Sequence, residues 1–247
     1  FLMSSAIYPS LKGRKVLITG GGSGIGAGLV AGFAKQGAQV HFIDLVDEIS
    51  ASLTDNRPVL HKCDLTDTPA LEKVLANILA DGPVNILVNN AARDDRHSLE
   101  EITSEFFDRN IGVNLKHLVM CTRVVAPAMK AAGGGVILNF GSISWHLGLP
   151  DLALYETAKA GIEGFTRAMA RELGRDNIRC NAIIPGNVKT PRQMKWYTPE
   201  GEKQIVDAQC LDGRLLPENV ASLALFLASD DASLLTAHSY WIDAGWR

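Results

Sequence analysis

Short apolar runs separated by longer segments with helical spacing dominate the hydrophobic pattern of this chain. Several of these runs are apolar on both faces, and most are followed within a few residues by a helical pattern. Strands of this kind alternating with helices are typical of a parallel sheet that is covered on both sides. The predicted strands are 15–19, 38–44, 58–65, 84–92, 135–142, 178–185 and 239–245.

The helical segments between the strands predict the two covering layers. The predicted helices are the segment from a glycine-rich turn to Gln36 and residues 104–131, 152–173 and 218–229. Residues 187–214 have few periodic apolar positions and are predicted to be a long excursion from the sheet. No repeat, linker or low-complexity tract divides the chain, so we predict one α/β domain over 1–247. Its expected architecture is a doubly wound parallel sheet (Rossmann fold) of about seven strands with helices on both faces.

Composition and charge narrow the classes of partner. The 247 residues are 47% hydrophobic and 21% charged, which is ordinary globular usage. A formal net charge of −3 argues against nucleic acid or an anionic membrane as the partner. No apolar run approaches the ~18–20 residues needed to span a bilayer. The four cysteines and six histidines lack metal-ligand spacing, so we expect reduced thiols, no metal site and a cytoplasmic protein.

A cluster of glycines, TGGGSGIG over 19–26, joins the first predicted strand to the first predicted helix. Glycines there allow a tight turn, let backbone N–H groups approach a pyrophosphate and let helix and strand pack closely. A glycine cluster alone is a weak signal, but this one has the required strand, helix and an acid about 20 residues later. It predicts a dinucleotide site that includes Gly20, Gly22, Ser23, Gly24 and Ile25.

Asp44, at the end of the second predicted strand, is that acid. A carboxylate in this position can accept hydrogen bonds from both ribose hydroxyls, and it repels a 2′-phosphate. The next residue is Leu45, which offers no positive charge to such a phosphate. The pattern therefore favours NAD over NADP. The alternative is that Asp44 caps a helix over 46–53.

Two further strand ends carry residues suited to the same cofactor. Asp64 follows the third strand, where its carboxylate can bind an adenine amino group beside the N–H of Leu65; the alternative is an ordinary loop cap. The fourth strand ends in NNAA (89–92), and we expect Asn89 to tie neighbouring strands together. The small residues that follow leave room for a cofactor, so the expected contacts are Asn90, Ala91 and Ala92.

The stretch 142–159, SISWHLGLPDLALYETAK, carries the candidate chemistry. Tyr155 and Lys159 are four residues apart in a predicted helix, so they share one face. A Tyr hydroxyl has a pKa near ~10, and a nearby ammonium is expected to lower it. Ser142, on the turn before the helix, can donate a hydrogen bond to the oxygen that gains or loses the proton. Alone, the pair would fit a surface helix better; with the dinucleotide motif upstream it predicts an acid–base site.

Together these motifs resemble the short-chain dehydrogenases/reductases over nearly the whole chain. Each signal is modest, but their order and spacing are specific: TGGGSGIG (19–26), Asp44, CDL (63–65), NNAA (89–92), Asn114, Ser142, YETAK (155–159) and IPGNVKT (184–190). The chain departs from the family's usual NNAG at Ala92, whose extra methyl group is expected to weaken cofactor affinity without abolishing it. Within the family, 139–164 and 240–247 are similar to bacterial NAD-dependent enzymes that oxidise an aldose at C1.

The resemblance implies a role for each matching residue. Tyr155 would be the general base that removes the C1 hydroxyl proton, Lys159 would lower its pKa and hold the nicotinamide ribose, and Ser142 would fix the substrate oxygen. Asn114 would disturb the long helix locally and seat a water that links Lys159 to solvent. The residues implied beside the nicotinamide are Pro185, Gly186, Val188 and Thr190. The implied reaction is hydride transfer from C1 of an aldopentose, such as D-xylose or L-arabinose, to NAD, which gives the aldonolactone.

A pentose needs several polar contacts, which we expect on the loops after the carboxyl ends of the strands. We expect 187–214 to act as a lid and His146 to be a neutral hydrogen-bonding residue rather than a catalytic one. Asp94 fits a solvated surface turn equally well. The candidate substrate residues are Asp94, Ser142, Ser144, His146, Tyr155, Asn187, Gln193 and Trp196.

Two features indicate assembly, and the family resemblance implies a homotetramer. Small residues recur along the predicted catalytic helix and aromatic residues gather near the C-terminus: Ala158, Gly161, Gly164, Ala168, Tyr240, Trp241 and Trp246. The alternative for the small residues is tight packing on the sheet, whereas the aromatic patch would be costly if left in water.

Two other functions fit parts of the sequence. A family member could act on another secondary alcohol, a deoxysugar acid or a 3-oxoacyl thioester, although the polar loops 93–97 and 144–146 argue against a long apolar acyl chain. A catalytically silent dinucleotide-binding scaffold would be favoured if Ser142, Tyr155 or Lys159 were missing, and all three are present.

Overall fold

The computed structural model describes residues 6–48, 57–194 and 197–246. Its centre is a seven-stranded sheet in the order β3-β2-β1-β4-β5-β6-β7, with every neighbouring pair parallel. The strands are β1 Lys15–Thr19, β2 Gln39–Asp44, β3 Val59–Lys62, β4 Ile86–Asn89, β5 Gly135–Phe140, β6 Ile178–Pro185 and β7 Ser239–Ile242. The predicted doubly wound parallel sheet is confirmed, and the prediction for β6 is right at both ends.

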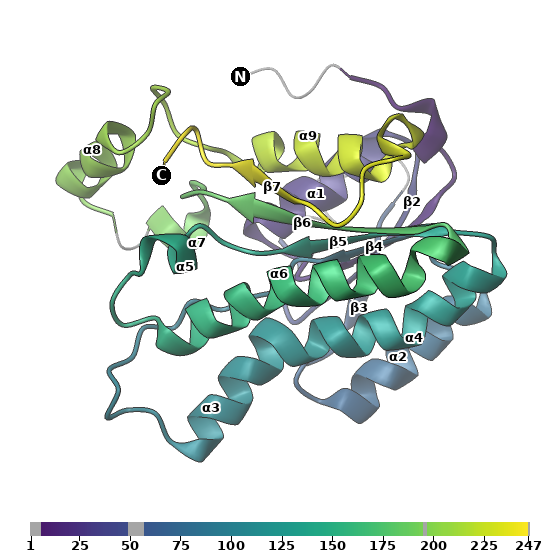
Figure 1. Ribbon diagram of the computed structural model, residues 1–247, viewed down its shortest axis with the longest axis horizontal. Coiled ribbons are helices and arrows are strands. Elements are labelled where there is room, and N and C mark those ends of the chain that lie inside the picture. Colours follow the sequence, from purple (N-terminus) through teal and green to yellow (C-terminus); the bar gives the residue numbers. More distant parts are fainter. Residues whose placement is uncertain (1–5, 49–56, 195–196, 247) are drawn as a thin grey trace.

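Helices cover both faces of this sheet, as predicted (Figure 1). One layer contains α1 and α9, and the other contains α2, α4 and α6. The helices are α1 Gly24–Lys35, α2 Thr68–Ala80, α3 Ser104–Ile111, α4 His117–Ala131, α5 Ser144–Leu147, α6 Ala153–Leu173, α7 Pro191–Met194, α8 Pro199–Asp207 and α9 Pro217–Ala228. Within the described ranges, no helix combines the length and apolar character that crossing a membrane requires.

The strands alternate between two apolar cores. In β1, Val16 and Ile18 lie in the cluster beneath α1 and α9, whereas Leu17 lies in the cluster beneath α2 and α4, and all three are fully buried. Burying an aliphatic side chain of this size contributes roughly 1.5–3 kcal/mol each. Because both faces of the central strands are enclosed, the polar groups at the strand ends are left to form the site.

The long predicted helix 104–131 is one continuous helical stretch with a π-helix, Gly112–Lys116, between α3 and α4. Asn114 lies in that π-helix and is fully buried. The predicted local disturbance of the helix at Asn114 is therefore confirmed. A π-helix widens the turn, and such turns occur often at functional sites.

The excursion 187–214 contains two helices that the apolar periodicity did not predict. In α8 only Ile205 is buried, so the hydrophobic signal is weak. Capping residues mark its start instead: Thr198 accepts a hydrogen bond from the Gly201 N–H, and Pro199 occupies the first turn. These are ordinary helix-start signals, and they would have found α8 in the sequence.

A pair of histidines connects the two strands at the β3 edge of the sheet. Nδ1 of His41 on β2 lies 3.0 Å from Nε2 of His61 on β3, with the ring centroids 5.3 Å apart. Burial lowers the pKa of both rings. For His41 the nearby charges of His61 and Lys15 act in the same direction, and Asp81 opposes them. The folded protein therefore holds this pair neutral.

Acid is expected to weaken the fold through this pair. The folded pKa values lie below the ordinary value of 6.5, so the unfolded chain binds more protons and the stabilisation is lost as pH falls through 6.5. The free energy of unfolding, measured by urea denaturation, should decrease between about pH 7.5 and about pH 5.5. The decrease should be smaller in His41→Gln than in the parent. It should be the same as in the parent in His238→Gln, because His238 is exposed. An equal decrease in all three proteins would contradict the assignment.

Candidate active site

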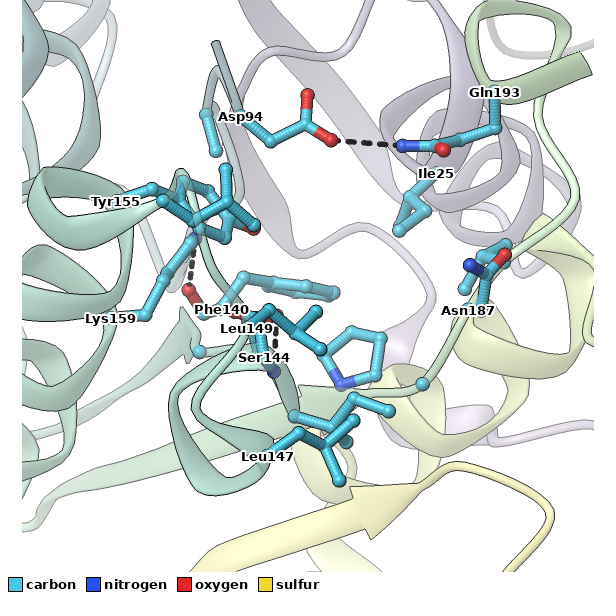
Figure 2. Close-up of a pocket in the computed structure, with 18 of the residues that line it drawn as sticks. Ile25, Asp94, Phe140, Ser144, Leu147, Leu149, Tyr155, Lys159, Asn187 and Gln193 are labelled. Atoms are coloured by element: carbon cyan, nitrogen blue, oxygen red, sulfur yellow. Dashed lines mark hydrogen bonds between the residues drawn. The ribbon is translucent and has the colours of Figure 1, made fainter. Parts of the chain in front are cut away.

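Two adjoining cavities open at the carboxyl edge of the sheet. The smaller one, about 240 Å³, is enclosed by the ends of β5 and β6, by α6 and by the start of the 187–214 segment (Figure 2). The larger cleft, about 790 Å³, runs over the glycine turn and the ends of β2, β3 and β4. Asn90, Tyr155 and Thr190 line both cavities. A ligand in the cleft and a ligand in the cavity would therefore meet at Tyr155.

The glycine turn between β1 and α1 forms the floor of the larger cleft. A Cβ on Gly26 would lie 1.8 Å from the Gly20 carbonyl oxygen, and one on Gly22 would lie 2.0 Å from the Val46 carbonyl oxygen. No side chain fits at either position, so the backbone closes tightly around the turn. The N-terminus of α1, at Gly24, opens into the same cleft and favours a negative charge there. This arrangement fits a dinucleotide pyrophosphate.

Asp44 holds the far side of this turn. Its Oδ2 accepts a hydrogen bond from the Gly22 N–H at 2.8 Å, and its Oδ1 accepts from the N–H groups of Leu45 at 2.7 Å and Val46 at 3.2 Å. A carboxylate has about four acceptor positions, so one remains for a ligand hydroxyl. Asp44 and Leu45 both line the cleft. The alternative helix at 46–53 falls partly outside the described residues.

The end of β4 is fastened to the end of β1. Thr19 Oγ1 accepts hydrogen bonds from the Asn90 and Ala91 N–H groups at 3.1 and 3.2 Å. The Asn90 side chain donates to the carbonyls of Thr19 and Gly20. Sequence reasoning missed the role of Thr19, because its partners Asn90 and Ala91 lie far downstream in the chain. Asn90, Ala91 and Ala92 all line the larger cleft.

Two other predictions about strand ends can be checked directly. Asn89 donates to Asn139 Oδ1 at 2.9 Å, which joins β4 to β5 and confirms its predicted structural role. Asp64 accepts from the Thr66 N–H at 2.8 Å and the Thr66 hydroxyl at 2.7 Å, and these bonds lower the pKa of its carboxyl group. Asp64 thus caps its loop, and it also lines the cleft beside Leu65.

Helix α6 brings Tyr155 and Lys159 to the end of β5, where Ser142 follows the strand (Figure 2). Lys159 Nζ donates to the Phe140 carbonyl at 2.7 Å and lies 5.4 Å from the Tyr155 ring centroid. The Ser144 N–H and hydroxyl lie 3.1 and 2.9 Å from Ser142 Oγ, and both donate to it. With its oxygen accepting twice, Ser142 has its own proton free to donate toward Tyr155 or a ligand oxygen.

Burial, not the neighbouring ammonium, dominates the proton affinities of this pair. It raises the pKa of Tyr155 to about 12, against a smaller lowering by the Ser142 hydrogen bond. It also lowers the pKa of Lys159 to about 7, with Asp94 acting in the opposite direction. The pKa of Tyr155 therefore moves in the direction opposite to the lowering expected from Lys159. Enclosure disfavours the charged form of both groups.

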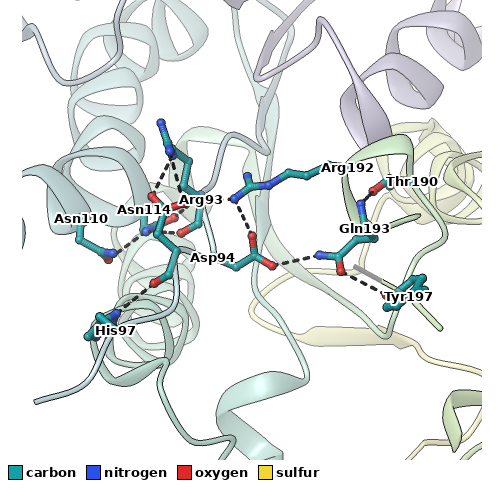
Figure 3. A network of polar contacts seen from close by, with 10 residues as sticks. Arg93, Asp94, His97, Asn110, Asn114, Thr190, Arg192, Gln193 and Tyr197 are labelled. Atoms are coloured by element: carbon teal, nitrogen blue, oxygen red, sulfur yellow. Dashed lines mark hydrogen bonds and ion pairs between the residues drawn. The ribbon is translucent and has the colours of Figure 1, made fainter. Parts of the chain in front are cut away.

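Asn114 uses its side chain within the protein (Figure 3). Its Oδ1 accepts from the Arg93 N–H at 2.8 Å, and its Nδ2 donates to the Arg93 carbonyl at 2.9 Å and to Asn110 Oδ1 at 3.0 Å. The π-helix thereby holds the chain just after Ala92 in place. The carboxamide supports the wall of both cavities.

The end of β6 and the residues after it form the opposite wall. Pro185, Gly186, Val188 and Thr190 all line the smaller cavity, and the Thr190 methyl group would lie 3.4 Å from a Cβ on Gly24. Val188 forms an isolated parallel bridge with Leu215. The start of the excursion is thus held next to the glycine turn.

Most candidate substrate residues converge on the smaller cavity. Its lining includes Asp94, Ser142, Ser144, Tyr155, Asn187 and Gln193, together with Trp246, which sequence reasoning did not assign to the site. Trp196 lies outside the described residues.

His146 is the exception, because it does not line either cavity. Its Nε2 lies 2.9 Å from Glu163 Oε1, which also accepts from the Trp145 indole N–H at 2.8 Å. The imidazole is packed between Trp145 and Trp241, at centroid distances of 3.6 and 4.3 Å. The prediction of His146 as a substrate contact is corrected, since the short helix α5 turns the ring away from the cavity and toward α6.

A polar network that sequence reasoning missed spans the mouth of the site (Figure 3). Arg192 forms ion pairs with Asp94 at 2.9 Å and with Asp95 at 3.3 Å. Gln193 Nε2 donates to Asp94 Oδ2 at 3.0 Å, and the Tyr197 hydroxyl contacts the Gln193 side-chain oxygen at 3.1 Å. No sequence motif marks Arg192 or Tyr197, because their partners lie about a hundred residues upstream or on the same irregular segment.

Within the described residues, no group of three or more His, Cys, Asp and Glu side chains is arranged to hold a metal ion.

The chain belongs to the short-chain dehydrogenase/reductase family. The family model described as enoyl-(acyl carrier protein) reductase matches residues 20–247. D-xylose 1-dehydrogenase of Caulobacter vibrioides (strain NA1000 / CB15N) is 64% identical over 251 residues, which cover 99% of this chain and 100% of that relative. The probable galactose dehydrogenase GalD of Rhizobium meliloti (strain 1021) is 44% identical, covering 98% of each. A solved short chain dehydrogenase/reductase family protein superposes with a TM-score of 0.85 at 29% identity, over 96% of this chain and 98% of that one.

Two glycines of the same helix provide a matched test of the turn. Gly26→Ala should destabilise the fold by more than about 1 kcal/mol and raise the dissociation constant for NADH at least about tenfold, because its methyl group meets the Gly20 carbonyl. Gly32→Ala places its Cβ 3.4 Å from Ala221 Cβ, an ordinary contact, and should change stability by no more than about 1 kcal/mol. Thermal unfolding and NADH fluorescence titration measure both effects. Similar behaviour of the two variants would contradict the model of a closed turn.

Proposed function

We propose that this protein oxidises an aldopentose, with D-xylose as the leading candidate, at C1 to the aldonolactone with NAD as hydride acceptor. The observation that carries this proposal is the 64% identity with a D-xylose 1-dehydrogenase over 99% of the chain. The small cavity agrees with it, since about 240 Å³ lies below the roughly 300–1,000 Å³ of pockets for drug-sized ligands. The polar side chains in its lining, among them Asp94, Asn187 and Gln193, suit a sugar better than the long acyl chain that the name of the matching family model suggests.

In this proposal, Tyr155 accepts the proton of the C1 hydroxyl while the hydrogen on C1 leaves as hydride and the C1–O bond becomes a carbonyl. NAD, when bound, supplies the hydride acceptor. Before the sugar binds, Ser142 donates its one proton to Tyr155 and favours the phenolate, as the direction of its effect on the pKa indicates. With the sugar bound, Ser142 donates that proton to the reacting oxygen. Lys159 holds the nicotinamide ribose through its ammonium group. Asn114 keeps the Arg93 backbone in place and, through a water, links Lys159 to solvent.

The lining of the larger cleft supports a set of cofactor contacts. We propose that the glycine turn binds the pyrophosphate, that Asp44 binds the adenosine ribose, and that Asp64 and Leu65 lie at the adenine. Asn90, Ala91 and Ala92 would then follow the cofactor toward the nicotinamide, where the end of β6 closes the site. The preference for NAD over NADP is proposed on the Asp44 carboxylate and on Leu45, which lacks a positive charge.

The organisation of the chain is proposed to be one domain over 1–247, with 187–214 as a lid. The ion pairs and hydrogen bonds between this segment and Asp94 support a lid, because they cross the cavity mouth. We also propose a homotetramer, supported by Gly161, Gly164 and Ala168, which are exposed along α6; Ala158, by contrast, is buried against the sheet. A cytoplasmic location is supported by the four free cysteines of the described chain.

The decisive experiment follows NADH absorbance across a panel of aldoses with NAD and NADP side by side. Turnover of D-xylose or another pentose with NAD is expected, together with formation of the lactone. Tyr155→Phe should reduce kcat at least about 100-fold, because it removes the proton acceptor. The same variant should bind NADH as the parent does. Retained turnover in Tyr155→Phe would rule out the assigned base, and an inactive parent would rule out the proposed function.

Asp44→Asn tests the origin of the cofactor preference. Removing the charge should lower the ratio of the NADPH to the NADH dissociation constant by about tenfold or more, because the repulsion of the 2′-phosphate is lost. Asp64→Asn is the matched control at a carboxylate of the same cleft and should leave the ratio unchanged. Fluorescence titration with each reduced cofactor measures the ratio. An equal change in both variants would show that Asp44 does not select the cofactor.

A further inference from the structure

Arg214 is a nearly buried cation beside the smaller cavity, with its side chain only 9% exposed. Its Nη1 pairs with Glu202 Oε1 on α8 at 2.5 Å, and its guanidinium carbon lies 5.0 Å from the Tyr197 ring centroid. Its Nη2 donates to Asn187 Oδ1 at 2.8 Å. A carboxylate, an aromatic ring and an amide thus contact one planar group from three sides and restrict its orientation.

The fixed guanidinium determines which way Asn187 faces. A guanidinium only donates, so the Asn187 atom that meets Arg214 must be the amide oxygen. The Tyr197 hydroxyl contacts the same oxygen. Figure 2 shows the Asn187 nitrogen on the cavity side of the amide and the oxygen turned away from it. Asn187 therefore presents a hydrogen-bond donor to the cavity.

Gln193 is oriented from the other side by the same reasoning. The Asp94 carboxylate only accepts, so the amide nitrogen of Gln193 faces it and the amide oxygen faces Tyr197. Burial raises the pKa of Tyr197, which therefore carries one proton for two amide oxygens. The Asn187 oxygen is contacted by both Arg214 and Tyr197, which takes up its two lone pairs. The Gln193 oxygen is contacted by Tyr197 and keeps a lone pair that can accept a proton from a ligand.

We propose that Arg214 is a positioning residue that sets the hydrogen-bond polarity of the sugar site. By its contacts with Asn187 and Tyr197, Arg214 turns the Asn187 NH₂ group toward the cavity, so that Asn187 donates a hydrogen bond to the ligand. Gln193 and Asp94, on the neighbouring wall, accept hydrogen bonds from the ligand. The ligand that matches is a polyol with one hydroxyl accepting at Asn187 and adjacent hydroxyls donating at Gln193 and Asp94. A simple aliphatic alcohol would leave these groups unpaired and would be rejected. This inference rests on the proposed function, because it concerns how the same site recognises its sugar.

Two variants test the assignment from opposite ends. Asn187→Asp keeps an oxygen for Arg214 and Tyr197 but replaces the cavity-facing NH₂ with an acceptor. Arg214→Lys keeps the charge but loses the planar fork, so Asn187 is free to turn over. Both should raise KM for the best aldose about tenfold or more, with kcat within about threefold of the parent and the NADH dissociation constant unchanged. A variant that was merely misfolded would lose kcat and NADH binding as well.

Deoxyfluoro sugars test directly which groups of the site donate hydrogen bonds and which accept them. A deoxyfluoro sugar keeps a weak acceptor at the substituted position but has no proton to donate. The parent should therefore tolerate fluorine at the ring position that faces Asn187 and reject it at the positions that face Gln193 and Asp94. Asn187→Asp should lose this tolerance, because an acceptor then meets the fluorine.

The control is Arg123→Lys, at an exposed Arg–Glu pair with Glu72 on α4 and α2 that is remote from both cavities. It should leave KM, kcat and the fluorosugar pattern as in the parent. If the parent oxidises aldoses and Asn187→Asp keeps both its KM and its fluorosugar pattern, the polarity assignment is wrong. If KM changes in Asn187→Asp but not in Arg214→Lys, the polarity of the site does not depend on Arg214. If the parent oxidises no aldose, the proposed function fails instead, and the sugar-facing role falls with it.

Discussion

Loss of solvation at Tyr155 and Lys159 is the constraint on which the rest of the site depends. Enclosure at the end of β5 moves both groups toward neutrality, which raises one pKa to about 12 and lowers the other to about 7. A general base that works near neutral pH needs the opposite change in the phenol. The surrounding groups must supply it, and within the described residues the strongest of these is the Ser142 hydrogen bond, prepared by the two donors of Ser144.

Asp94 and Arg192 also affect the pKa of Tyr155, and they shift it in opposite directions. The Asp94 carboxylate raises the pKa of Tyr155, and the Arg192 guanidinium lowers it. The two are joined in an ion pair of 2.9 Å, so their fields at Tyr155 partly cancel while the pair is intact. Arg192 belongs to the excursion and Asp94 to the loop after β4. The electrostatic environment of Tyr155 is therefore tied to the position of the segment that carries Arg192.

The parts of this architecture that sequence reasoning predicted are those set by local chemistry. The seven strands and the glycine turn each follow from residues within one short window, whereas the irregular helix at Asn114 was expected only from the family resemblance. His146 was assigned to the cavity because it follows Ser142 closely, and the structure turns it toward Glu163, a partner seventeen residues away. The Tyr155 pKa was predicted with the wrong sign because spacing along a helix reports a neighbour but not the depth of burial.

The network around Arg214 could not be predicted from the sequence for a further reason. Its side chain meets Glu202, Tyr197 and Asn187 on one irregular segment, where no periodicity specifies which atoms converge. The groups proposed for the chemistry lie instead on β5 and α6, whose positions are fixed by two apolar cores. Precision in the groups proposed for the chemistry thus comes from packing, whereas the orientation of the Asn187 amide comes from one nearly buried cation. On the proposal made for Arg214, substitutions around it change which hydroxyl pattern is accepted while the ends of β5 and α6 stay in place, because polar contacts hold the first part and apolar packing holds the second.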